Sequence, residues 1–195
     1  MPLPAPAPRE ELHRRQIDVR GYRRNDGLLD VEATIIDTKS YAFTLDTDGR
    51  HLQAGDALHS MTVRLTFDEH YVVQEAVAVT DASPHATVCP SASAAVANLK
   101  GLAMAAGWNR AVRERLGGAK GCTHELELLG QMATVAFQTL APLKPGGFAV
   151  AADAGAKPNK IDSCYAYASN RPLVLKRWPT FYDGPGAEGA APAAA

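Results

Sequence analysis

Met61-Thr62-Val63-Arg64-Leu65-Thr66-Phe67 is the stretch that decides the fold, because its apolar residues alternate strictly with polar ones. Side chains on a β-strand point to opposite faces in turn, so a period of two predicts a strand with one buried face. The polar turn around Asp68-Glu69-His70 then leads into Val73, Glu75, Val77 and Val79. Together the two segments predict a β-hairpin.

The residues before this hairpin predict further strands. Leu29, Val31, Ala33 and Ile35 alternate with polar residues over 30–34. Asn25-Asp26-Gly27 separates this strand from a looser one over residues 16–22, since these residue types tolerate left-handed backbone angles in turns. A shorter strand is predicted over residues 41–45, before a polar turn over residues 46–49.

The hydrophobic period changes near Pro90, a residue suited to the first turn of a helix because it needs no hydrogen-bond donor there. Helices are predicted over residues 91–102, 108–116 and 123–140. The third has an apolar stripe formed by Leu126, Leu129, Met132, Ala133, Ala136, Phe137 and Leu140. Late strands are predicted over residues 162–167 and 173–175.

This order of elements predicts an α+β fold. An antiparallel sheet over residues 16–80 in the N-terminal half, joined by a late strand, would be packed by about three helices in the C-terminal half. We expect one domain over residues 16–183, an extended Pro-rich arm over residues 1–15, and a disordered tail over residues 184–195.

Composition argues against several classes of function. The 195 residues carry a net charge of −1, with a pI of about 6.6, so a nucleic-acid-binding surface is not expected. No run of about 18 apolar residues predicts a membrane span, and the N-terminus lacks the basic and apolar regions of a secretory signal. We therefore expect a cytoplasmic protein whose three cysteines are reduced thiols. Composition does not indicate its oligomeric state.

Gly121-Cys122-Thr123-His124 stands where the third predicted helix begins. A thiol at a helix N-terminus is driven toward the thiolate, which binds metals or attacks electrophiles. With Cys89 and Cys164, Cys122 and His124 would make a Cys3His ligand set suited to zinc or iron. The alternative is that the three cysteines are small buried residues and His124 is a surface histidine.

A metal-free reaction is a second hypothesis for the same residues. Cys122 would be the nucleophile, and His124 or the loop residue His85 would be the base. Glu125 and Glu127 in the same turn oppose this, because negative charge disfavours a thiolate.

Other polar residues give weaker signals. Asp37-Thr38-Lys39 follows a predicted strand, where it suits either a site or a turn. His51, His59 and His70 lie in or near turns and carry no spacing signal.

The chain as a whole resembles the bacterial family known as domain of unknown function 2889, over about residues 8–183. The resemblance rests on Asp37-Thr38-Lys39, Leu58-His59-Ser60-Met61, Thr80-Asp81-Ala82, Cys89-Pro90, residues 99–102, Gly107-Trp108, Leu116-Gly117-Gly118, residues 121–129, residues 136–139, residues 162–166 and Trp178-Pro179. Such proteins accompany genes of aromatic-acid and acyl-CoA catabolism, so the resemblance implies a role in that metabolism.

A looser resemblance is to the iron–sulfur cluster scaffolds of the NifU type. Gly55-Asp56 before a hairpin, Cys89 after it, a helix ending at Lys100-Gly101, and Cys122 opening a long helix match that pattern. The resemblance implies that Cys89 and Cys122 bind metal. The middle cysteine of the scaffold pattern, expected near residues 101–107, is absent, and His124 follows its cysteine instead of preceding it.

The sequence is therefore compatible with two functions. The first is a small metal-dependent or thiol-dependent enzyme that acts on an aromatic or acyl compound, with Cys122 and His124 as ligands or as nucleophile and base. The second is a non-catalytic metal-binding or cluster-carrier protein. A closed set of four protein ligands would favour the second, because metal catalysis needs an open coordination position.

Overall fold

The structure, a computed structural model, describes residues 2–144, 156–158 and 160–186. It divides into two compact units, Met1–Ala141 and Pro142–Ala195, and each is described by itself. The domain boundaries drawn from the sequence stay a prediction.

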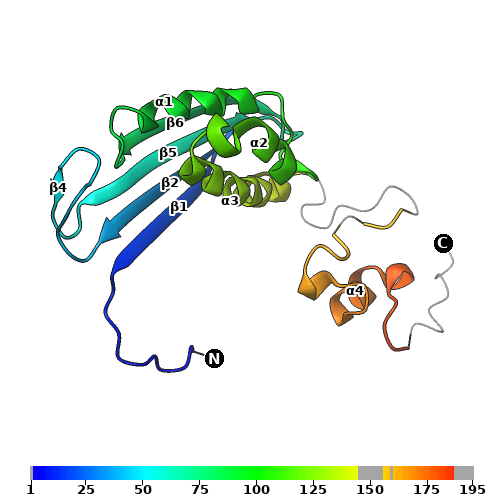
Figure 1. Cartoon of the computed structure of the whole chain (residues 1–195). Coiled ribbons are helices and arrows are strands. Elements are labelled where there is room, and N and C mark those ends of the chain that lie inside the picture. Colours follow the sequence, from blue (N-terminus) through cyan, green and yellow to red (C-terminus); the bar gives the residue numbers. More distant parts are fainter. Residues whose placement is uncertain (1, 145–155, 159, 187–195) are drawn as a thin grey trace. The chain divides into compact units, whose positions relative to one another are not determined.

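The first unit contains a four-stranded antiparallel sheet (Figure 1). Its strands are β1 (His13–Arg23), β2 (Leu29–Lys39), β5 (Ala57–Phe67) and β6 (Val73–Ala82), and they lie in the order β1-β2-β5-β6. A short hairpin, β3 (Phe43–Thr44) with β4 (His51–Leu52), connects β2 to β5. Both hairpins predicted from period-two patterns are confirmed.

One face of this sheet is the core. Leu29, Val31, Ala33 and Ile35 of β2 are buried, and so are alternate residues of β5 from Met61 to Phe67. The polar residues between them lie on the other face, where Thr34 and Thr62 share a hydrogen bond of 3.0 Å. The α+β class with helices on one face of the sheet is confirmed.

Helices that follow β6 in the chain cover the apolar face of the sheet. Their bounds are α1 (Cys89–Ala92), α2 (Trp108–Leu116) and α3 (Thr123–Leu140), with the 3-10 turns η1 (Ser93–Leu99), η2 (Gly118–Lys120) and η3 (Ala141–Leu143). α3 packs on β1, β2 and β5, whereas η1 packs on β6. The single helix predicted over residues 91–102 is thus a short α-helical turn followed by a 3-10 helix.

α3 begins at Thr123, as predicted, with Cys122 as its N-cap residue. Its buried face differs in part from the predicted stripe. Leu129, Met132, Ala136 and Leu140 are buried as expected, but Phe137 is exposed and Glu125 is fully buried. Glu125 accepts a hydrogen bond from Ser93, whose hydroxyl in turn lies 2.9 Å from that of Thr80 on β6.

The late strands are the wrong part of the prediction. In the second unit the described elements are η5 (Tyr165–Tyr167), α4 (Pro172–Arg177) and η6 (Pro179–Phe181). Pro172 opens α4, where a missing backbone donor costs nothing, so the apolar run after it is helical. The predicted sheet-joining strand is therefore replaced by a helix, and most of the predicted tail lies outside the described residues.

In the part of the chain that the structure describes, no helix combines the length and the apolar character needed to cross a lipid bilayer.

Candidate metal centre

A row of polar side chains crosses one end of the sheet, on its covered face. Arg15 of β1 is the direct cross-strand neighbour of Asp37 on β2, and Asp37 is the neighbour of His59 on β5. The strands are antiparallel, so the start of β1, the end of β2 and the start of β5 meet at the end that carries the β3–β4 hairpin (Figure 1). The next row inward is apolar, with Ile35 beside Met61.

Asp37 is the hub of this row and is almost fully buried. Arg15 donates two hydrogen bonds of 2.7 Å to it, from Nε to Oδ1 and from Nη2 to Oδ2. His59 Nδ1 lies 3.0 Å from Oδ2, and His13 Nε2 lies 3.5 Å from Oδ1. Two histidines from strand ends and a guanidinium thus surround one carboxylate.

α3 brings a further histidine to the same carboxylate. His124, in the first turn of the helix, stacks on His59 with ring centroids 3.8 Å apart. Its Nε2 lies 3.8 Å from Asp37 Oδ2. One ligand atom each from Asp37, His59 and His124 lie within 4.8 Å of one another, which defines a candidate metal centre.

The electrostatics favour an ionised carboxylate beside neutral imidazoles. Burial alone would raise the pKa of Asp37, but its hydrogen bonds to Arg15 and the charges of Arg15, His59 and His13 outweigh that and hold its pKa below the usual value. Burial, and then the proximity of His124, lower the pKa of His59. Burial, and then the charge of Arg15, lower the pKa of His124. Neutral imidazole and ionised carboxylate are the forms that bind metals.

The second ring nitrogen of His124, Nδ1, lies near a sulfur atom. Cys122 Sγ is 3.8 Å from His124 Nδ1 and also 3.8 Å from Met61 Sδ. The pairing of Cys122 with His124 predicted from the sequence therefore exists as a contact in the structure.

The other predicted site residues have different surroundings. Cys89 is half-buried at the start of α1, and His85 is an exposed residue whose carbonyl accepts the amide hydrogens of Val88 and Cys89. Among the described residues, neither forms a hydrogen bond or ion pair with Cys122 or His124. Cys164 is exposed and belongs to the second unit, so its membership of a Cys3His set stays a prediction, as does that of Cys89.

Asp37 and His59 stand out less in the sequence than Cys122 and His124 do. Both continue the buried side of an apolar alternation by one step: Asp37 follows Leu29 to Ile35, and His59 precedes Met61 to Phe67. His59 lies within β5 and not in a turn. A polar residue in phase with the buried face of a strand was the available signal, because such a residue needs a partner inside the protein.

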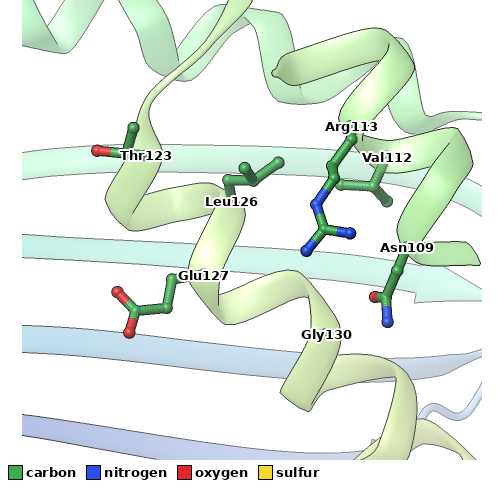
Figure 2. Close-up of a pocket in the computed structure, with 7 residues that line it drawn as sticks. All are labelled: Asn109, Val112, Arg113, Thr123, Leu126, Glu127 and Gly130. Atoms are coloured by element: carbon green, nitrogen blue, oxygen red, sulfur yellow. The ribbon is translucent and has the colours of Figure 1, made fainter. Parts of the chain in front are cut away.

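A hollow of about 340 Å³ lies on the outer side of α3, between α3 and α2 (Figure 2). Figure 2 shows the guanidinium of Arg113 directed into it beside Leu126, while the carboxylate of Glu127 turns to the other side of α3. Glu127 accepts a hydrogen bond from Arg15, the residue that also holds Asp37. Glu127 therefore lines the hollow and also belongs to the cluster around Asp37.

Fold and cluster together describe an α+β protein with a His/Asp cluster where strand ends meet a helix start. The family model described as "Protein of unknown function (DUF2889)" matches residues 13–138, and the chain belongs to this family. The matched segment contains all the cluster residues, from His13 to Glu127. No curated protein and no solved structure matches the chain, and these comparisons lend no support to the NifU-type resemblance.

Proposed function

We propose that the protein is a metal-dependent enzyme that binds a divalent transition metal through Asp37, His59 and His124. The convergence of their ligand atoms within 4.8 Å carries the proposal. Bonds of about 2.0–2.2 Å place two ligand atoms on one ion at most about 4.4 Å apart. The three side chains would have to rotate to bring their ligand atoms within that limit when an ion binds.

The charges around the cluster support a dication. Asp37 and Glu127 each contribute one negative charge, Arg15 contributes one positive charge, and the lowered pKa values keep His59 and His124 neutral near pH 7. Glu127 thus offsets the positive charge of Arg15, whose hydrogen bonds orient Asp37. Hydrogen-bonded carboxylate ligands of this kind are common around metals, because outer contacts fix the ligand.

The ligand set favours a catalytic role over a structural one. Two histidines and one carboxylate are typical of catalytic zinc and of non-haem iron, and three protein ligands leave coordination positions open. A zinc or ferrous ion would supply a Lewis acid there. His59 and His124 both keep some solvent exposure, which supports access by a small molecule. An aromatic or acyl substrate, which the family resemblance implies, stays a prediction.

Two other functions remain as alternatives. The 3.8 Å contact between Cys122 Sγ and His124 Nδ1 favours a thiol-dependent enzyme with these residues as nucleophile and base. A non-catalytic metal carrier would need a fourth protein ligand to close the site. Cys122, whose Sγ lies 3.8 Å from His124 Nδ1, would take that role only if the ion were bound at Nδ1.

Elemental analysis of protein purified without added metal, followed by titration of the chelator-treated protein with Co²⁺, tests the proposal. We expect Asp37→Asn, His59→Gln and His124→Gln each to weaken Co²⁺ binding by at least about tenfold. His51→Gln is the matched control, because His51 is exposed and bonds Thr44 in the β3–β4 hairpin. Wild-type protein that binds no Co²⁺, or cluster variants that bind it as tightly as the control, would contradict the metal centre.

A further inference from the structure

We propose that Met61, Cys122 and His124 form a site for monovalent copper, on the side of the His124 ring that faces away from Asp37. The site shares the imidazole of His124 with the proposed divalent centre but uses its other nitrogen. It does not depend on that centre, because Asp37 and His59 are not among its ligands.

The spacing of the donor atoms carries the inference. Cys122 Sγ lies 3.8 Å from Met61 Sδ and 3.8 Å from His124 Nδ1. Bonds of about 2.3 Å to sulfur and 2.0–2.1 Å to imidazole, at trigonal to tetrahedral angles, place neighbouring ligand atoms about 3.6–4.0 Å apart. Both separations fall in this range, so the thiol and each of its two neighbours stand as far apart as two ligands of one ion.

The chemistry of the donors selects the metal. A thiolate and a thioether are soft ligands that suit Cu(I), whereas a thioether is a poor ligand for magnesium, calcium or manganese, which take oxygen donors. Met61 is fully buried and Cys122 half-buried, so the ion would sit at the edge of the core, beneath the first turn of α3. The helix N-terminus and the absence of any capping hydrogen bond from the Cys122 side chain leave its sulfur available as a ligand.

The contacts of His124 complete the argument. A metal-bound histidine commonly donates its other ring N–H to a carboxylate, which fixes the ring. With Nδ1 toward the sulfurs, Nε2 is the nitrogen that lies 3.8 Å from Asp37 Oδ2. One ring nitrogen of His124 therefore faces the Cys122 sulfur and the other faces the Asp37 carboxylate, which a small shift would bring into hydrogen-bond range. Met61 is held in place within the sheet, because β5 is paired on both sides: its cross-strand neighbours are Ile35 on β2 and Thr80 on β6.

Competition for Cu(I) from its bicinchoninate complex, under anaerobic reducing conditions, tests the site in the full-length protein. Wild-type protein is expected to withdraw one Cu(I) per chain. Met61→Leu, which preserves volume in the core, and Cys122→Ser should each weaken binding by at least about tenfold. Met132→Leu and Cys89→Ser are the matched controls: Met132 is equally buried, on α3, and Cys89 is also half-buried.

Outcomes with the two metals separate this proposal from the divalent centre. His59→Gln should weaken Co²⁺ binding by at least about tenfold and keep Cu(I) affinity within a few-fold, whereas Met61→Leu should keep Co²⁺ binding. X-ray absorption of the Cu(I) form should show two sulfur neighbours and one nitrogen. Failure of wild-type protein to compete, equal losses in Cys89→Ser and Cys122→Ser, or an unchanged affinity in Met61→Leu would overturn the copper site. Circular dichroism of each variant identifies misfolding, and Cys122→Ala replaces Cys122→Ser if the latter does not fold.

Discussion

Arg15 and Asp37, directly opposite each other on β1 and β2, are joined by two hydrogen bonds of 2.7 Å. A guanidinium and a carboxylate paired in this two-pronged way fix each other's orientation as well as their charge. Because Asp37 is 1% exposed, water cannot hydrate its carboxylate. Arg15 supplies the hydrogen bonds and the positive charge instead. The pair therefore has a structural role whether or not a metal is bound.

Replacing Arg15 should destabilise the protein far more than replacing its neighbour. Arg15→Met leaves a buried carboxylate without its cation, and we expect a loss of about 2–4 kcal/mol in the free energy of unfolding. Arg14→Met is the control, since Arg14 and its ion-pair partner Glu11 are both exposed, and it should cost no more than about 0.5 kcal/mol. Urea denaturation of chelator-treated protein measures both.

A second substitution checks the cause. Asp37→Asn in the Arg15→Met background removes the unpaired charge, so it should recover part of the lost stability. Equal costs for the two arginine variants, or no recovery in the double variant, would show that the ion pair is not what stabilises this end of the sheet.

The histidines beside this pair predict loss of stability in acid. Burial lowers the pKa of His59 and of His124, so the unfolded chain takes up protons before the folded protein does. Their contribution to stability is therefore complete above the unfolded value of about 6.5 and is lost as the pH falls from there toward the folded pKa values, by at most about 1.4 kcal/mol per histidine per pH unit.

Urea denaturation of metal-free protein between about pH 7.5 and about pH 5.5 measures this slope. His59→Gln should make it shallower, whereas His70→Gln, at an exposed position beside Glu69, should not. A wild-type slope of zero across this range would mean that the two imidazoles titrate as freely in the folded protein as in the unfolded chain.

The secondary-structure elements that carry this site could be predicted from the sequence better than its ligand residues. Alternation over residues 61–67 and 29–35 identified β5 and β2 correctly, because burial of one face leaves a period of two. Each strand, however, extends beyond its apolar run, and it is in those extensions that Asp37 and His59 lie. Their burial depends on partners from other strands, which a single-strand pattern does not contain.

Cys122 and His124 were found because their signal is local. A thiol and an imidazole two residues apart at a helix start can be recognised without knowledge of the fold, and the helix does begin at Thr123. Met61 was predicted as a core residue and is one, but its contact with Cys122 joins β5 to α3 across 61 positions of sequence. Hydrophobic patterns treat a thioether like any apolar group, so its role as a donor is visible only in three dimensions.

Glu125 predicts a pH dependence of the opposite sign. Burial raises its pKa, an effect that the hydrogen bond from Ser93 only partly offsets, and its Oε2 is buried without a hydrogen-bond partner among the described residues. An acid whose pKa is raised on folding costs stability as the pH rises above its unfolded value of about 4.3–4.5 and through its folded value.

Substituting this acid should remove that cost. The difference in unfolding free energy between Glu125→Gln and wild type should shift in favour of the variant as the pH rises from about 4.5 to about 7.5. Glu114→Gln, at an exposed position on α2, should show a constant difference over the same range. A constant difference for Glu125→Gln as well would mean that the carboxyl ionises normally in the fold.

Two glycines, one on β1 and one in α3, should respond in opposite directions to alanine. A Cβ at Gly21 on β1 would meet Thr139 of α3, with Thr139 Cβ at 2.9 Å and Cγ2 at 3.0 Å and Oγ1 closer still. Gly21→Ala therefore forces the helix away from the sheet and should destabilise by about 1–3 kcal/mol.

At Gly130, inside α3, the nearest atom to an added Cβ is Asn109 Oδ1 at 3.5 Å, an ordinary contact. Gly130→Ala should stabilise by about 0.5–1 kcal/mol, because alanine loses less backbone entropy in a helix. Thermal and urea unfolding measure both, and Thr139→Ala in the Gly21→Ala background should restore part of the loss. If Gly21→Ala is as stable as wild type, α3 does not approach β1 as closely as the structure shows.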